Sequence, residues 1–138
     1  MAMTLISNLL AHLARRDQPR LAVEWWVDVK VPETESYVGF QTSDISLPGV
    51  RLKGETSEAF RRMIGRDGHA HMRLRIPGHR ESYSVRAELK WGLGNTGSFL
   101  TGWRFSGLPR PARRQLRSYI DSHPELKVQE VVEGQARA

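Results

Sequence analysis

The sequence contains no cysteine. This excludes a disulfide scaffold, a thiolate zinc site and a cysteine nucleophile, and it is consistent with a reducing compartment. The sequence also has no run of about 20 apolar residues, the length that a membrane-spanning helix requires. Its apolar N-terminal stretch, residues 1–13, is followed by arginines rather than preceded by them, the reverse of the order in a secretory signal. We therefore expect a cytoplasmic protein.

The common sequence signatures of enzymes are also missing. The chain has no phosphate-binding GxxxxGK[ST] motif, no dinucleotide-binding GxGxxG motif and no serine nucleophile elbow. His69 and His71 share one face of an expected strand, but no further ligand stands at a recognisable metal spacing. We therefore predict a protein without catalytic activity, metal or cofactor, in which both histidines lie at the surface.

Positive charge is what the sequence has in excess. There are 21 Lys and Arg residues against 15 Asp and Glu in 138 residues, and most of the excess is arginine. The planar guanidinium group binds phosphate and guanine edges and stacks on flat rings. The composition therefore suits an anionic partner such as a nucleotide or a nucleic acid, although a basic balance alone does not choose between them.

Apolar residues at every second position predict a mainly β domain. In the first expected strand, Val23, Trp25, Val27, Val29 and Val31 alternate in this way. We predict strands over residues 22–31, 37–43, from 50 onward, 70–76, 83–91 and 99–105. Short strands in series without helical crossovers indicate an antiparallel barrel or sandwich.

Helices are expected at the two ends of this β region. An apolar stripe at steps of three and four predicts a short amphipathic helix in residues 1–14. A second helix should begin at Pro109 or Pro111 and end before Pro124, with Leu108, Ala112, Leu116 and Ile120 on its buried face. Residues 55–68 suit one helical turn or a structured loop. The segment 123–138 reads as a polar tail, expected to be partly disordered.

Two short motifs carry the functional interpretation. The first is Arg16-x-x-x-Arg20, preceded by Arg15, in the linker before the first strand. The second is Asp44-x-Ser46-x-x-Gly49, at the expected turn after the second strand. Each motif alone is weak, since arginine pairs and Asx turns are common. Their order and their positions around the first two strands make the combination specific.

This pair of motifs resembles the signature of the PilZ domain family, RxxxR followed by [D/N]xSxxG. The resemblance covers residues 15–120, because the strand end 87–91 and the run 102–105 before an arginine-rich helix are similar to the family's last strands and helix. It implies a six-stranded antiparallel β-barrel with a C-terminal α-helix over residues 15–122. It also implies a receptor for cyclic di-GMP with no chemistry of its own.

The resemblance, together with side-chain chemistry, gives the expected ligand-binding residues. Arginine donates to guanine O6 and N7 and to phosphate, and a carboxylate accepts from the N1–H and N2–H edge of guanine. Gly49 is expected to allow positive φ and close approach of the ligand. By family resemblance, Trp91 contacts the ligand and Arg15 favours a pair of ligand molecules. The full set is Arg15, Arg16, Arg20, Asp44, Ser46, Gly49 and Trp91.

The expected function is a receptor that changes conformation on binding cyclic di-GMP. Ligand would order the arginine linker and redirect the N-terminal helix, regulating a protein partner in motility, pilus or exopolysaccharide pathways. Two alternatives stay open. One is a PilZ-like adaptor that binds proteins without nucleotide. The other is a basic β-barrel that binds single-stranded nucleic acid, which requires aromatic residues interleaved with basic ones on one face of the sheet.

Overall fold

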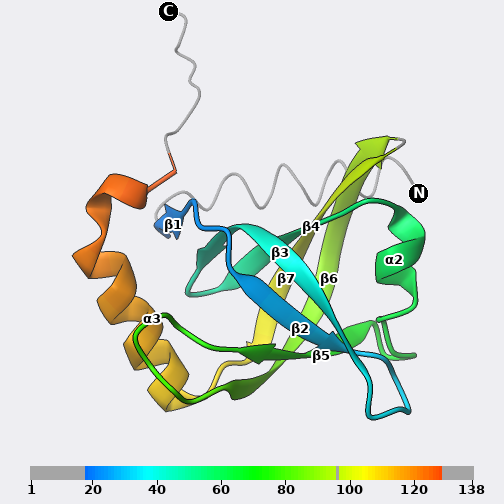
Figure 1. Cartoon of the computed structure of the whole chain (residues 1–138), viewed down its shortest axis with the longest axis horizontal. Coiled ribbons are helices and arrows are strands. Elements are labelled where there is room, and N and C mark those ends of the chain that lie inside the picture. The colour runs from blue at the N-terminus through cyan, green and yellow to red at the C-terminus, as the bar shows by residue number, and fades with distance from the viewer. Residues whose placement is uncertain (1–17, 96, 129–138) are drawn as a thin grey trace, which may run out of the picture.

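The computed structural model describes residues 18–95 and 97–128. The helix predicted over residues 1–14, together with Arg15 and Arg16, lies outside these described residues. The elements, in chain order (Figure 1), are β1 (Arg20–Leu21), β2 (Trp26–Lys30), β3 (Tyr37–Ser46), β4 (Gly49–Gly54), α2 (Ser57–Arg61), β5 (His69–Leu74), β6 (Tyr83–Asn95), β7 (Ser98–Gly107), α3 (Arg110–Ser122) and the 3₁₀ turn η1 (Pro124–Leu126).

The strands form a closed antiparallel barrel. Their order is β1-β3-β2-β5-β6-β7-β4, and an additional pairing of β3 with β4 closes the circle through six strands. The short β1 is an extra strand that pairs only with β3 inside this order. In Figure 1, α3 and α2 lie on opposite sides of the barrel. The six-stranded barrel with a C-terminal helix, expected from the sequence, is confirmed.

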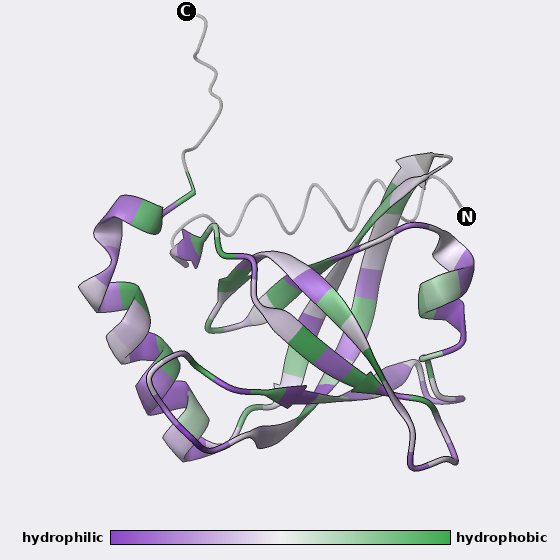
Figure 2. Ribbon diagram, in the orientation of Figure 1, coloured by the Kyte–Doolittle hydropathy of each residue, from purple (hydrophilic) through white to green (hydrophobic). Residues whose placement is uncertain are grey.

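The barrel interior is filled by the alternating apolar residues of the strands. Val27 and Val29 of β2 are buried, as are Met72 and Leu74 of β5. Figure 2 shows the matching alternation of hydrophobic and hydrophilic bands along the strands. Since successive side chains of a strand point to opposite faces, the other half of each strand is left to form the outer surface.

The C-terminal helix closes one side of the barrel as predicted. It starts after Pro109 and buries Ala112, Leu116 and Ile120 at a spacing of four residues. Tyr119 on the same helix meets Trp25 edge to face, with 5.1 Å between the ring centroids. The helical turn considered for residues 55–68 is the short α2, which buries Phe60 and is capped by the Thr56 side chain, an acceptor from the Ala59 N–H.

The first expected strand is shorter in the structure, because residues 22–25 lie in a break between two strands. We predicted one strand over residues 22–31, but β1 ends at Leu21 and β2 begins at Trp26. The buried Thr42 hydroxyl explains the break, because it accepts from the Trp25 N–H at 2.9 Å and donates to the Val23 carbonyl. A side chain thus satisfies backbone groups that a strand partner would otherwise bind. The alternating burial continues through the break, so the sequence pattern did not reveal it.

The second motif also differs from its expected local structure. We predicted that β3 ends at Ser43 and that a turn follows, but β3 continues through Asp44 and Ser46. A β-bulge between Thr42 and Asp44 shifts the register with β4. After such a bulge the alternation is offset by one residue. Asp44 and Ser46 therefore leave the barrel interior while remaining on a paired strand.

The segment after α3 returns to the start of the barrel. Leu126 accepts a hydrogen bond from the Ala22 N–H, and Val128 donates one to the Arg20 carbonyl, both at 2.8 Å. The region that the sequence assigned to a polar tail therefore begins as part of the fold, and residues 129–138 lie outside the described part. In the described part of the chain, no helix is long and apolar enough to span a bilayer.

Candidate ligand-binding site

The two motifs meet where β1 pairs with the end of β3. Arg20 stands directly opposite Ser46 in the ladder, and Leu21 stands opposite Ile45. The Arg20 side chain lies beside Asp44, with 3.6 Å between Arg20 Nε and Asp44 Oδ1. Both side chains are largely shielded from solvent, with 11% and 6% exposed. The arginine of the first motif and the carboxylate of the second thus form one site.

The position of Arg20 is fixed by its backbone rather than by its side chain. Leu21 is fully buried in the barrel and anchors β1 from one side. The Val128 N–H donates to the Arg20 carbonyl from the other side. Because β1 pairs with β3 on one edge and is hydrogen-bonded to residues 126–128 on the other, its backbone holds Arg20 beside β3.

The positive φ expected for Gly49 is not found in the structure. Its φ is not positive, so conformational freedom does not explain the glycine. A Cβ at this position would lie 2.1 Å from the Trp103 carbonyl oxygen, a contact that no side chain can make. The glycine therefore allows β4 and β7 to approach closely at the end of the motif. Ser46 Oγ, which donates to the Gly49 carbonyl at 3.2 Å, closes the turn.

Arg51 is a site residue that the sequence analysis missed. It stands directly opposite Asp44 on β4, and its Nη1 lies 3.5 Å from Asp44 Oδ2. Its guanidinium carbon lies 5.4 Å from the centroid of the Trp91 ring, within the range of a cation–π contact. The available signal was its position two residues after Gly49, on the same face of a strand. Arg51 connects Asp44 to Trp91.

Trp91 is buried on the outside of the barrel. Its side chain is 1% exposed, yet it is not part of the apolar cluster that fills the interior. Its ring lies against Gly102 of β7, where an added Cβ would come within 2.3 Å of the indole. The structure therefore brings both Trp91 and Asp44 next to the guanidinium of Arg51.

The Asp44 carboxyl is in an environment of opposing electrostatic effects. Burial raises the pKa of Asp44 above its usual value near 3.8, because a low-dielectric site disfavours the ionised form. The Arg51 and Arg20 guanidinium groups act in the opposite direction, without cancelling the effect of burial. The protein thus keeps a partly desolvated carboxylate between two cations at the junction of both motifs.

The sequence of this chain matches the family model for the PilZ domain over residues 14–122, most of its length. The chain belongs to the PilZ domain family. A search of curated proteins found no match.

Solved structures with the same fold include a PilZ domain and two longer proteins. The PilZ domain of YcgR from Escherichia coli with cyclic di-GMP has a TM-score of 0.60 and 18% identity, over 80% of this chain and 92% of that one. The Bacillus subtilis inhibitor of motility, MotI or DgrA, has a TM-score of 0.62 and 13% identity, over 80% of this chain and 52% of that one. The MrkH–cyclic di-GMP complex from K. pneumonia has a TM-score of 0.59 and 14% identity, over 80% and 53% of the two chains. The PilZ chain thus spans about half the length of MotI and MrkH.

The structure describes five of the expected site residues, and they differ in how they belong to the site. Arg20, Asp44 and Ser46 meet at the β1–β3 junction, while Gly49 supports the adjoining turn. Trp91 reaches this group through Arg51. The other two expected residues, Arg15 and Arg16, lie outside the described part of the PilZ chain.

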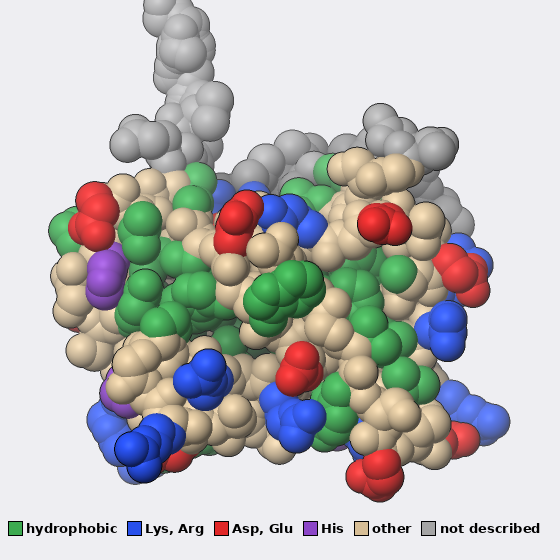
Figure 3. Space-filling model, viewed as in Figure 1, with side chains coloured by type: hydrophobic (Ala, Val, Ile, Leu, Met, Phe, Trp, Pro, Cys, Tyr) green, Lys and Arg blue, Asp and Glu red, His purple; other side chains and the backbone are tan. Residues whose placement is uncertain are grey.

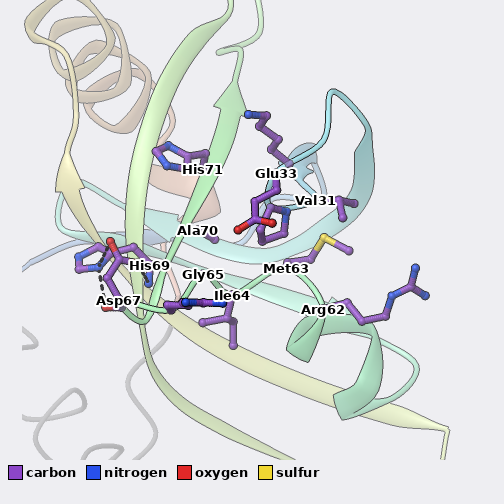
Figure 4. Close-up of a pocket in the computed structure, with 13 residues that line it drawn as sticks. Val31, Glu33, Arg62, Met63, Ile64, Gly65, Asp67, His69, Ala70 and His71 are labelled. Carbon is purple, nitrogen blue, oxygen red and sulfur yellow. Dashed lines mark hydrogen bonds and ion pairs between the residues drawn. The ribbon is translucent and has the colours of Figure 1, made fainter.

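A hollow of about 750 Å³ lies elsewhere, between the β2–β3 turn, the loop before β5 and β5 itself (Figure 4). The two histidines that the sequence analysis considered as metal ligands line this hollow, and His69 is half-buried while His71 is exposed. His69 lies beside Asp67 at the rim of the hollow. The pKa of the Asp67 carboxyl is lowered, mainly because the carboxyl accepts a hydrogen bond from the backbone N–H of His69 and to a smaller extent because it contacts Arg86. Among the described residues, no group of histidines and carboxylates is arranged to hold a metal ion.

Proposed function

We propose that this PilZ domain is a receptor for cyclic di-GMP. The observation that carries the proposal is the junction of the two motifs, where Arg20 lies opposite Ser46 and 3.6 Å from Asp44. A guanine base presents acceptors at O6 and N7 and donors at N1 and N2. A guanidinium and a carboxylate side by side match these two sets of groups. YcgR and MrkH, which have the same fold, were solved with this ligand.

Each residue of the junction has a distinct part in this proposal. Asp44 accepts from the N1–H and N2–H edge of guanine, and Arg20 donates to guanine or phosphate oxygens. Ser46 adds a hydroxyl beside them. The Trp91 ring is 1% exposed, so it enters the proposal as the support of Arg51. Direct stacking of Trp91 on the ligand stays a prediction and requires the ring to be uncovered.

Arg16 and Arg15 complete the proposed site from the linker before β1. Arg16 is the second arginine of the first motif and is proposed to bind the ligand together with Arg20. Arg15 is proposed to favour two ligand molecules per protein. The stoichiometry of binding tests this role, since Arg15→Ala should then reduce two bound molecules to one.

The proposed output is control of a protein partner in a motility, pilus or exopolysaccharide pathway. Arg16 stands in the segment between residues 1–14 and β1, and Arg20 lies in β1 itself, so ligand held by both arginines would order the segment before β1. Hydrogen exchange over residues 8–21 should slow when cyclic di-GMP is added. Identical exchange with and without ligand would show that this switching mechanism is wrong.

The binding proposal is tested by isothermal titration of cyclic di-GMP into the wild-type chain and into Arg20→Ala and Asp44→Ala. A charge-assisted hydrogen bond contributes roughly 1.5–3 kcal/mol, so each variant should bind about ten- to a hundredfold more weakly. Arg80→Ala is the matched control, because Arg80 is an exposed arginine in the β5–β6 loop. Absence of binding by folded wild-type protein would refute the receptor function.

One observation favours the alternative of an adaptor that binds a protein partner. Trp26 on the outer face of β2 is 65% exposed, and it lies over Gly39 of β3. Large exposed aromatic residues are enriched where proteins bind each other. A partner captured equally by wild-type protein and Arg20→Ala, without nucleotide, would support this alternative.

The nucleic-acid alternative fits the charge distribution less well. On the face in Figure 3, basic and acidic side chains are interspersed rather than gathered into a basic band. Two of the basic side chains near Trp26 are paired with acids, Lys53 with Glu24 and Arg73 with Asp28. RNA binding that weakens steeply with salt and is tighter than cyclic di-GMP binding would favour nucleic acid as the ligand.

A further inference from the structure

Four residues of the site form one row across four strands of the barrel. Asp44 of β3 is the register partner of Arg51 of β4, and Arg51 is the partner of Gly102 of β7. Gly102 is in turn the partner of Trp91 of β6. Directly opposite residues on neighbouring strands have their Cβ atoms about 5 Å apart and interact. Through this row, the second motif is connected across neighbouring strands to Trp91, which is more than forty residues away in the sequence.

Gly102 determines how the row is packed. An added Cβ would lie 2.3–2.7 Å from three atoms of the indole, so the Trp91 ring covers the strand at this point. Because Gly102 stands between Trp91 and Arg51, the ring reaches across β7 to the guanidinium, 5.4 Å away. Stacking on an aromatic ring orients a guanidinium plane and restricts its rotamers.

Arg51 and Arg20 approach different oxygens of Asp44. Arg51 Nη1 lies 3.5 Å from Oδ2, and Arg20 Nε lies 3.6 Å from Oδ1. Both separations exceed the 2.7–3.2 Å of an N–H···O hydrogen bond, so the two contacts are ion pairs. They attract the ionised form of the carboxyl from both sides and leave its lone pairs available to a donor from a ligand.

We propose that Arg51, stacked on Trp91, is a positioning residue that keeps the Asp44 carboxylate ionised and oriented to accept from the guanine edge of the ligand. This inference rests on the proposed function. In it, Arg51 acts through Asp44, and the ligand itself contacts Asp44 and Arg20. The arrangement gives a barrel residue outside both motifs control over recognition of guanine.

The pH dependence of binding follows from the groups that face Asp44. Among the described residues, these are Arg20 from β1 and Arg51 from β4. Burial already raises the pKa of Asp44, and loss of Arg51 removes one of the two cations that oppose it. The pKa should then rise further. A protonated carboxyl cannot accept two N–H donors as a carboxylate does. The affinity for cyclic di-GMP should therefore fall as the pH decreases through the pKa of Asp44. Without Arg51, this fall should begin at a higher pH.

The test compares Arg51→Gln with Arg51→Lys and with the control Arg73→Gln. Arg73 is also a cation over an aromatic ring, Tyr37, and lies 4.0 Å from Asp28, but it belongs to β5. The Asp44 carboxyl is titrated by carbon NMR in the ligand-free proteins, and cyclic di-GMP affinity is measured by calorimetry from pH 5 to pH 8. In Arg51→Gln we expect a higher Asp44 pKa and a loss of affinity of about tenfold or more at pH 5, with a smaller loss at pH 8. Arg51→Lys should recover most of both, and Arg73→Gln should change neither.

Gly102→Ala tests the same row without removing a charge. The added methyl group displaces Trp91, so the pKa of Asp44 should move in the same direction as in Arg51→Gln. An unchanged Asp44 pKa in the folded variants, or an affinity loss equal at every pH, would overturn the role of Arg51 while leaving the receptor function intact. Absence of cyclic di-GMP binding by the wild-type chain would instead overturn the proposed function, and with it the proposed effect of Arg51 on ligand recognition.

Discussion

Two glycines at the site are required for space. Gly49 lies against the Trp103 carbonyl, and Gly102 lies against the Trp91 ring. Neither has a positive φ, so both act through the absence of a side chain. Because neither has a Cβ, β7 can lie close to Gly49 and the Trp91 ring can lie close to Gly102. The site is therefore sensitive to additions of a single methyl group.

A methyl group at Gly102 should destabilise the domain. In Gly102→Ala the new Cβ meets buried indole atoms at 2.3–2.7 Å, and overpacking of this kind costs about 1–3 kcal/mol. Gly107→Ala on the same strand is the control, since its Cβ has its nearest neighbour at 3.9 Å. The measurement is urea unfolding of both variants, followed by tryptophan fluorescence. Equal stability of the two variants would mean that Trp91 moves aside without loss.

The residues of the two motifs were identifiable in the sequence because both motifs are short and local. Their expected meeting depends only on one strand pairing, that of Arg20 with Ser46. The spacing of Arg51 from Gly49 was the only local signal for it, because its role depends on Gly102 and Trp91, which become its neighbours only when β4, β7 and β6 align in register. A pattern along the chain contains no information on that alignment.

At the level of elements, a side chain separates the first two strands, β1 and β2, from each other. Thr42 bonds to the backbone of both Trp25 and Val23, while its own N–H donates to the Trp25 carbonyl at 2.8 Å. The break lets the chain leave β1, which carries Arg20, and enter β2. Thr42 therefore determines how the arginine-bearing strand joins the barrel.

Thr42→Val should destabilise this junction. Valine has the same shape but leaves a buried N–H and a buried carbonyl without the hydroxyl, a loss of about 1–3 kcal/mol. Thr34→Val is the control, because the Thr34 hydroxyl bonds to the Val31 carbonyl and accepts from the Ser36 N–H in an exposed turn where water can replace it. The free energy of unfolding of each variant is compared in urea. A loss of similar size in both would indicate that burial of the Thr42 hydroxyl has no special effect.

Periodicity predicted the elements better than their ends. The stripe of Ala112, Leu116 and Ile120 determined α3, since one face of a helix must be apolar to pack on a sheet. The break before Trp26 and the extension of β3 to Ser46 were missed. In both cases a hydroxyl bond or a bulge changes the backbone partners, and neither changes the alternation of apolar residues that the sequence displays.

For the whole molecule, ligand binding and stability should be linked. A ligand that binds only the folded state stabilises it by about 2.7 kcal/mol at a concentration of 100 times the Kd. For a domain of this size, that corresponds to an increase in Tm on the order of 10 °C. We expect this shift for wild-type protein with cyclic di-GMP and no shift with GTP at the same concentration. In Asp44→Ala the shift should be largely lost, and an undiminished shift would place the ligand at another site.

The pairing of residues 126–128 with Arg20 and Ala22 has a practical consequence for anyone who attaches a reporter to this protein. The first and last described segments leave the barrel side by side, with the Val128 N–H donating to the Arg20 carbonyl. The chain is therefore suited to circular permutation with new ends in the β5–β6 loop, in which residues 129–138 would run directly into residues 1–17. Such a permuted protein would carry these joined residues as one segment that leaves Val128 and returns to Arg20 beside Asp44, and a fluorophore inserted in it should respond to occupancy of the site.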